Sequence, residues 1–354
     1  MFNYEMLVLA RESRGLNQTD LAALAGVQQG TISKIESGLL QPSADLIELF
    51  SARLHYPPAF FAEHEPVYGF NATVFFHRKR QSLPDRVLRK LHAQVNISRM
   101  RVKKLKRSLE IDAAFRFQAM EPLEYGGPAG VARLVRQMWQ MPPGPVRDLI
   151  QVIEDAGGIV IEFDFGTKQA DAISEWVPNS PPIFVLNSNA EISWDRRRLT
   201  LAHELGHIIL HKLGPNPQME DEANEFAAEF LMPRREIKPS LYGLTMAKLR
   251  DLKRYWKVSM QALVERAYQL KTITLNQRKY FYISLNKNGH TRVHEPMEFE
   301  FLPEKPQLFH SMLRAHLEKL DYSMRELATL LFFEEAATLE AELFGEKGPR
   351  LIVA

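Results

Sequence analysis

The segment from Arg196 to Lys212, RRRLTLAHELGHIILHK, constrains the fold of this chain more than any other. It is a largely apolar run in which His203 and His207 are four residues apart, and Glu204 directly follows the first histidine. We expect a single helix here, beginning near Ser193 or Trp194. Residues four apart lie one turn apart on the same face of a helix, so both imidazoles can reach one metal ion.

A metal site on this helix needs more than two histidines. Glu204 is rotated by about 100 degrees from His203, so it need not be a ligand and can instead act as a base on a metal-bound water. A catalytic zinc site also requires a third protein ligand and an open position. His211 continues the four-residue series, but it lies about 12 Å along the helix axis from His203 and cannot share the ion.

The next helical pattern offers a third ligand. After the short turn LGPNPQ, the sequence MEDEANEFAAEFLMP places Glu220, Asn224 and Ala227 on one stripe. Small alanines permit close approach of two helices, so Glu220 can meet the histidines while Asn224 offers an outer-shell hydrogen bond. Glu222 and Glu225 fall on other faces and are weaker candidates. The preceding segments GGIVIEFDF and PPIFVLNSN have the composition and boundaries of strands.

The first sixty residues contain several short helical patterns separated by glycines. We expect one helix over Gln18–Ala25, with Asn17 as its N-cap. Gly26 permits a tight turn, after which a second helix over Gln28–Ser37 can cross the first at a steep angle. The second helix directs polar side chains outward, namely Gln28, Gln29, Thr31, Ser33 and Lys34. Such side chains suit a reader of the DNA major groove, and a helical bundle used only for protein contacts is the alternative.

A strongly basic segment follows. Between His77 and Arg107 there are twelve Lys or Arg residues and one acid, Asp85. Pro84 and Asp85 open an amphipathic helix of about 25 residues with one apolar stripe. It is either a solvated helix packed on its neighbour or a contact with a nucleic-acid backbone. The candidate backbone contacts are Arg78, Lys79, Arg80, Lys103, Lys104, Lys106 and Arg107.

Two parts of the sequence resemble known families. The segments NQTDLAALAG and ISKIESG resemble the helix-turn-helix domain of phage-repressor-like, XRE-type regulators. This resemblance implies that Gln29 and Ser33 face bases and that Gln18 and Lys34 approach phosphates. Gly30 stands where these regulators often carry a polar residue. The predicted partner of the N-terminal residues is therefore DNA.

RRRLTLAHELGHIILH followed by EDEANEFAAEFLMP resembles the ImmA/IrrE family of metallopeptidases. The likeness continues through LRDLKRYWKVSMQALVERAYQL and GHTRVHEP, and the order of an XRE domain before a peptidase domain resembles fused members. The resemblance implies a zincin-like domain in which His203, His207 and Glu220 bind Zn²⁺ and Glu204 is the catalytic acid and base. It also implies a substrate, typically a helix-turn-helix repressor. Mn²⁺ could occupy the same ligands.

The sequence therefore predicts a zinc-dependent metalloendopeptidase. The strand PPIFVLN could pair with an extended substrate at its edge. Two alternatives compete with this interpretation. One is a DNA-binding transcription regulator whose metallopeptidase-like domain serves sensing or protein contacts, and the other is a degenerate peptidase kept as a metal-stabilised scaffold.

The C-terminal residues begin with YFYISLNKNGHTRVHEPMEFEFLP, whose alternation predicts a strand pair around Asn288 and Gly289. Two helical patterns follow. A second helix-turn-helix is conceivable there, but Glu334, Glu335 and Glu340 stand where a DNA reader would carry Gln, Arg or Lys. We interpret this end as a sensor, dimerisation or regulatory module, which would allow a homodimer.

Length and composition set the overall class. The chain has 354 residues, of which 45% are hydrophobic and 25% charged, and it is too long for one ordinary core. We expect a multidomain, mainly α protein with four parts: an all-α helix-turn-helix bundle (1–66), a basic helical linker (67–125), an α+β zincin-like peptidase domain (126–275) and a small α+β C-terminal domain (276–354). The absence of cysteine excludes thiolate ligands. No run of about 18 to 20 apolar residues and no signal peptide is found, so we expect a cytoplasmic protein without membrane contact.

Overall fold

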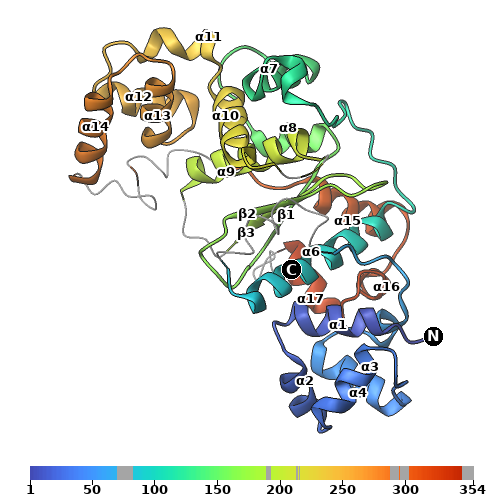
Figure 1. Ribbon diagram of the computed structural model, residues 1–354. Helices are drawn as coiled ribbons and strands as arrows, with labels where there is room; N and C mark the ends of the chain where they lie inside the picture. The colour runs from blue at the N-terminus through green and yellow to red at the C-terminus, as the bar shows by residue number, and fades with distance from the viewer. Residues whose placement is uncertain are drawn as a thin grey trace, which may run out of the picture. The chain divides into compact units, whose positions relative to one another are not determined.

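The computed structural model describes residues 1–69, 83–188, 193–212, 214, 216–287, 295 and 303–344. These residues form two compact units (Figure 1). The first unit contains residues 1–69, 83–111 and 308–344, and the second contains the described residues between 112 and 307. The chain is multidomain and mainly helical, as the sequence predicts, with a helical N-terminal bundle and one α+β unit. Among the helices of the described residues, none has both the length and the apolar character that a membrane span requires.

The first unit is entirely helical in its described part. Its elements are α1 (Tyr4–Ser13), α2 (Gln18–Ala25), α3 (Gln29–Glu36), α4 (Ala44–Leu54), the 3₁₀ helix η1 (Pro58–Ala62), α6 (Asp85–Leu105), α15 (Leu308–Lys319), α16 (Met324–Leu330) and α17 (Ala336–Phe344).

Local sequence signals set the ends of α2. The side chain of Asn17 accepts a hydrogen bond from the backbone N–H of Asp20, and the Asp20 side chain accepts one from the N–H of Asn17. This capping box satisfies two backbone donors that a helix start leaves without partners. Gly26 ends the helix in the left-handed conformation, with φ at 64°, which a glycine adopts without steric cost. Both the Asn17 cap and the Gly26 turn were predicted and are confirmed.

The core of the first unit joins distant parts of the chain. Ile32 and Ile35 of α3 are fully buried, together with Phe60. Phe332, between α16 and α17, packs edge-on against Phe60 with ring centroids 5.0 Å apart. The residues after 307 therefore complete the core of the N-terminal helices, whereas residues 276–287 belong to the second unit. This division departs from the boundary predicted at residue 276, and the four-part domain assignment remains a prediction.

The second unit has a small sheet surrounded by helices. Its elements are η3 (Pro122–Tyr125), α7 (Pro128–Met138), α8 (Leu149–Asp155), β1 (Ile159–Phe163), β2 (Ala172–Glu175), β3 (Ile183–Asn187), α9 (Trp194–Leu210), α10 (Met219–Leu231), α11 (Arg234–Ile237), η4 (Lys238–Leu241), α12 (Met246–Trp256), α13 (Met260–Gln269) and α14 (Leu275–Lys287).

The described strands form one sheet in the order β1-β3-β2. β1 runs parallel to β3 with Ile159 opposite Ile183, and β2 runs antiparallel to β3 with Ser174 opposite Phe184. The strands expected in GGIVIEFDF and PPIFVLNSN are confirmed as β1 and β3, whereas β2 was not predicted. The prediction that PPIFVLN offers a free edge to substrate is wrong, because β3 is the central strand and both its edges are paired.

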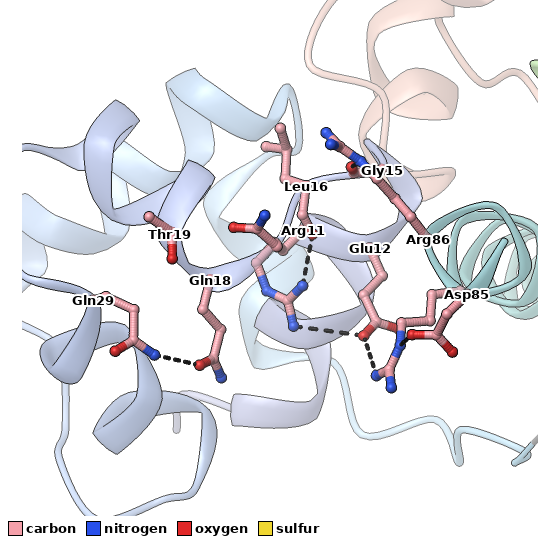
Figure 2. A pocket seen from close by; sticks show the side chains of 11 residues that line it. Arg11, Glu12, Gly15, Leu16, Gln18, Thr19, Gln29, Asp85 and Arg86 are labelled. Atoms are coloured by element: carbon pink, nitrogen blue, oxygen red, sulfur yellow. Dashed lines mark hydrogen bonds and ion pairs between the residues drawn. The ribbon is translucent and has the colours of Figure 1, made fainter.

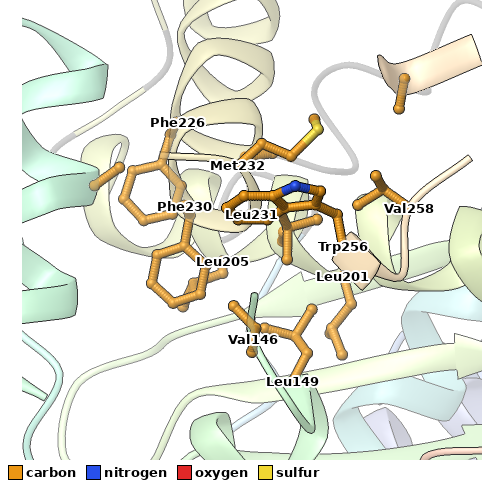
Figure 3. Packing of buried hydrophobic residues seen from close by; sticks show 14 of the residues in the cluster. Val146, Leu149, Leu201, Leu205, Phe226, Phe230, Leu231, Met232, Trp256 and Val258 are labelled. Carbon is orange, nitrogen blue, oxygen red and sulfur yellow. The ribbon is translucent and has the colours of Figure 1, made fainter. Parts of the chain in front are cut away.

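Helices α9 and α10 pack face to face (Figure 1). A Cβ added at Gly206 of α9 would lie 3.2 Å from Cα of Ala223 in α10. The two helices can therefore approach this closely because position 206 is glycine and faces the small Ala223. Beside this contact, Leu205, Phe226 and Phe230 form part of the buried core (Figure 3). The close packing of the two helices determines where their polar faces meet.

The predicted strand pair near the C-terminus is wrong in its first half. Residues Tyr280–Lys287 lie in α14, not in a strand. Phe281 and Leu285, four residues apart, are the buried side chains of this helix, so the helical period prevails over the aromatic and β-branched composition. The predicted turn at Asn288 and Gly289 and almost all of the second strand lie outside the described residues.

Candidate metal centre

Helix α9 holds the two histidines rigidly. Its apolar residues Leu201, Leu205 and Ile208 are buried in the core of the second unit. Near its N-terminus, buried Arg198 donates hydrogen bonds to the backbone carbonyls of Val146 and Lys257. This anchoring directs the polar face of the helix, which carries the histidines, toward α10.

The three residues predicted as ligands converge. The Nε2 atoms of His203 and His207 lie 2.9 Å apart. One carboxylate oxygen of Glu220 lies 3.6 Å from Nε2 of His203, and the other lies 3.4 Å from Nε2 of His207. One ligand atom from each of the three residues lies within 4.8 Å of the others. This spacing is compatible with a single ion bound by two imidazoles and one carboxylate.

The cluster is buried on one side only. The side chain of His207 is 3% exposed, that of His203 is 14% exposed and that of Glu220 is 44% exposed. The Glu220 side therefore remains accessible to solvent. Catalytic zinc sites differ from structural ones by keeping one position open to water or substrate, and this half-exposed arrangement is consistent with a catalytic site.

Asn224 lies where the sequence predicts an outer-shell partner. Its side-chain oxygen is 2.9 Å from Nδ1 of His203. Since an amide oxygen can only accept, the Nδ1–H of His203 is the donor, and the lone pair of a neutral imidazole is then on Nε2. Nε2 is the atom that faces Glu220 and His207. Asn224 is thus positioned to orient His203 for metal binding.

Sequence reasoning missed a second outer-shell chain. Nδ1 of His207 lies 3.0 Å from Nδ1 of His211, and Nε2 of His211 lies 2.9 Å from Oε2 of Glu222. The side-chain amide of Asn216 donates to the same Glu222 oxygen. From the sequence, His211 and Glu222 are considered only as metal ligands, and the structure instead places them behind His207. The signal that could have identified them is the spacing of His211 four residues after His207.

The pKa values of His211 and Glu222 are both lowered. Burial lowers the pKa of His211, and its contact with Glu222 opposes that effect only in part. Burial acts to raise the pKa of Glu222, but hydrogen bonds from Asn216 and His211 outweigh it, so the pKa of this carboxyl lies below its usual value. A neutral imidazole therefore lies beside an ionised carboxylate.

Glu204 does not point into the solvent. It is 2% exposed, and the hydroxyl of Ser174 donates a hydrogen bond of 2.6 Å to its Oε2. Ser174 lies on β2 and was missed, because no periodic signal marks that four-residue strand. A serine alone carries no indication of this role. The hydrogen bond orients the Glu204 carboxylate, which lies on the same helix as the two histidines.

The predicted DNA-facing residues lie at the start of α2, at the N-cap of α3 and along α3. Gln28, Gln29 and Lys34 are exposed, whereas Thr31 and Ser33 are half-buried. The side chain of Gln18 accepts a hydrogen bond from the amide of Gln29 at 2.8 Å, and Figure 2 shows these side chains pointing toward each other at the edge of a pocket. This contact fixes the orientation of both amides before any ligand binds.

Two acidic residues that precede the basic helix form ion pairs with its cations. Lys103 of α6 and Arg107, two residues after the end of this helix, both contact the carboxylate of Glu65, and Lys104 pairs with Glu63. Burial acts to raise the pKa of Glu65, but these hydrogen bonds and charges lower it overall. A count restricted to the residues from His77 to Arg107 misses Glu63 and Glu65, so it overstates the positive charge of this region. Arg78, Lys79 and Arg80 lie outside the described residues, and nucleic-acid contact by this segment remains a prediction.

Comparison with known families agrees with this architecture. Residues 7–61 match a helix-turn-helix family model, and residues 153–268 match the model of the IrrE N-terminal-like domain, a peptidase family. The second match includes His203, Glu204, His207 and Glu220. No curated protein matches the chain. The chain therefore fuses an XRE-type helix-turn-helix domain to a metallopeptidase-family domain of the ImmA/IrrE type.

Proposed function

We propose that this chain is a zinc-dependent endopeptidase that cleaves a regulatory protein, with a helix-turn-helix repressor as the expected substrate. DNA or another signal would control it through its helix-turn-helix and C-terminal residues. The observation that carries the proposal is the convergence of His203, His207 and Glu220, whose ligand atoms lie within 4.8 Å of one another.

The donor set suits zinc. Two imidazoles and one carboxylate are a common ligand set of catalytic zinc sites, and Mn²⁺ accepts the same donors. The hydrogen bond from His203 to Asn224 supports this assignment, because it leaves the metal-facing nitrogen of His203 without a proton. A Zn²⁺ ion bound there supplies a Lewis acid and lowers the pKa of a coordinated water toward about 7.

We assign the proton transfer to Glu204. Glu204 follows His203 directly, and its carboxylate is held in place by the hydroxyl of Ser174. We assign Glu204 as the general base that accepts a proton from the attacking water and then delivers it to the leaving amine. Its burial keeps bulk water away from this carboxylate, so the proton moves within the site.

The helix-turn-helix domain supports the choice of substrate class. A repressor is found on DNA, and a peptidase tethered to a DNA-binding unit meets its substrate there at a raised local concentration. The exposed Gln28, Gln29 and Lys34 supply side chains that can hydrogen-bond base edges or phosphates. Recognition of DNA would thus restrict cleavage to repressor molecules near the DNA sites that the helix-turn-helix domain binds.

The test is cleavage of a repressor encoded beside the gene. Purified full-length protein is incubated with this repressor, with and without DNA and with and without a zinc chelator. Glu204→Gln serves as the matched variant, because it keeps the size of the side chain and removes the base. We expect a defined cut only with wild type and metal. Absence of cleavage under every condition would contradict the proposal.

A second candidate function is a DNA-binding transcription regulator that uses the peptidase-like unit for sensing. The observation favouring it is the exposed polar face of α3. The same Glu204→Gln variant separates the two candidates, since a regulator that does not cut would keep its cellular phenotype and its DNA binding when this carboxylate is lost.

A further inference from the structure

We propose that His211 and Glu222 form a hydrogen-bond relay that fixes His207 in its metal-binding tautomer. The proposal rests on the proposed function, because it concerns an outer shell of the same metal site. His211 and Glu222 are positioning residues here and neither is a ligand. The relay runs from His207 through His211 to Glu222, with contacts of 3.0 and 2.9 Å.

The direction of each hydrogen bond follows from the last residue of the relay. The Glu222 carboxylate can only accept, so Nε2 of His211 must carry the proton that faces it. In a neutral imidazole the other nitrogen is then an acceptor. Nδ1 of His211 thus accepts from Nδ1–H of His207. His207 is left with its lone pair on Nε2, the atom that faces Glu220.

These hydrogen bonds leave Nε2 of both His203 and His207 without a proton. Asn224 orients His203 in the same way, so both Nε2 atoms present lone pairs to each other at 2.9 Å, beside the Glu220 carboxylate. Two lone pairs and an anion at this distance repel one another unless a cation lies among them. The two outer-shell contacts therefore prepare the cluster for a metal ion before the ion arrives.

The two positioning residues of the relay come from two different helices. The side chain of His211, which ends α9, is fully buried. Glu222 is in the first turn of α10, where its negative charge is favoured by the helix dipole, and Asn216 donates to it from the connecting turn. Glu222 is 25% exposed, so its replacement leaves less of a cavity than replacement of His211.

The experiment measures the Zn²⁺ affinity of the full chain by competition with a chromophoric chelator. Glu222→Ala removes the last acceptor, and Glu225→Ala, an exposed carboxylate in the same helix, is the matched control. We expect Glu222→Ala to bind Zn²⁺ about 10- to 100-fold more weakly, as for other outer-shell partners of zinc ligands. Glu222→Gln keeps an acceptor oxygen and should recover most of the affinity.

A second readout follows the tautomer directly. Long-range ¹H–¹⁵N spectra of histidine-labelled protein should show the proton of His207 on Nδ1, both without and with Zn²⁺, and a mixture of tautomers in metal-free Glu222→Ala. A purely structural role of Glu222 would not change the tautomer. His211→Phe, which keeps a ring of similar size, should match Glu222→Ala, and if it does not fold the Glu222 variants carry the test alone.

The outcomes separate the relay from the metal site. Equal Zn²⁺ affinity and one His207 tautomer in wild type, Glu222→Ala and Glu225→Ala would overturn the relay while leaving the zinc site intact. If instead wild type bound Zn²⁺ no more tightly than His203→Ala, the proposed function itself would fail.

Discussion

The hydroxyl of Ser174 lies 2.6 Å from Oε2 of Glu204, although the two residues are thirty positions apart on β2 and α9. Both residues are at least 95% buried. Through this serine the sheet contacts the glutamate that directly follows His203 of the candidate metal centre, and the hydrogen bond helps to orient its carboxylate. This contact links the small sheet to the proposed chemistry.

Replacing Ser174 by Ala should lower kcat with little change in KM. A hydrogen bond to a charged group contributes about 1.5 to 3 kcal/mol, so we expect a loss of about tenfold or more in kcat. Steady-state kinetics on a cleaved repressor peptide would measure it, and Zn²⁺ content should stay the same. Ser180→Ala, in the turn between β2 and β3, is the control; a kcat equal to wild type in Ser174→Ala would refute the assigned role.

Replacing Gly206 by Ala should push α9 and α10 apart. The new Cβ would lie 3.2 Å from Cα of Ala223 and 3.3 Å from its carbonyl oxygen, and backbone atoms cannot move aside as a flexible side chain can. We expect a loss of about 1 to 3 kcal/mol in unfolding free energy. The separation would also weaken Zn²⁺ binding, because Glu220 is on the displaced helix.

Urea unfolding and chelator competition would measure both effects. Gly30→Ala is the matched control, since a Cβ there meets no atom within 4 Å and alanine favours a helix. If Gly206→Ala were as stable and bound Zn²⁺ as tightly as wild type, the close helix contact would not be needed.

Replacing Lys253 by Met should strongly destabilise the second unit. The fully buried Nζ lies 2.5 Å from a carboxylate oxygen of Asp195 and 2.8 Å from one of Glu295. Removal of this cation leaves two buried carboxylates without compensation, which costs about 3 to 5 kcal/mol. Thermal unfolding would detect the loss. Arg250→Met, exposed on the same helix, should change the stability by less than about 0.5 kcal/mol, and an equally small effect of Lys253→Met would count against the buried ion pairs.

The first unit should lose stability in mild acid because of His92. Burial lowers the pKa of His92, the charges of Arg99 and Arg89 lower it further, and the hydrogen bond of its Nε2 to the carbonyl of Tyr68 opposes this shift. The folded pKa therefore lies below the unfolded value of about 6.5. As pH falls through about 6.5, the unfolded chain binds the proton first, so stability declines until the folded pKa is passed.

Urea midpoints of the first unit between pH 7.5 and 5.0 would measure this decline. Glu65, whose pKa is also lowered, contributes only below about 4.5, outside that window. His92→Gln should flatten the curve. A curve for His92→Gln that stayed parallel to wild type would show that another group causes the decline.

Patterns confined to one helix were predictable from sequence. Asn17 and Gly26 mark the ends of α2 by local backbone chemistry, and the four-residue spacing of His203 and His207 places both on one helical face whatever surrounds them. These features depend on hydrogen bonds and side-chain directions within a few residues. For Glu220, the period predicts its place on the next helix, but its approach to the two histidines depends on the packing of α10 against α9.

Tertiary structure decided the features that depend on distant residues. Ser174 meets Glu204 only because β2 pairs with β3 and packs against α9, and no local signal predicts that pairing. The cations of α6 are partly balanced by Glu63 and Glu65, which a count along the helix cannot include. Residues Tyr280–Lys287 form a helix because Phe281 and Leu285 are buried in the core, which overrides their strand-like composition. In each case the outcome depends on contacts between segments that are distant in the sequence, whereas local propensity depends only on neighbouring residues.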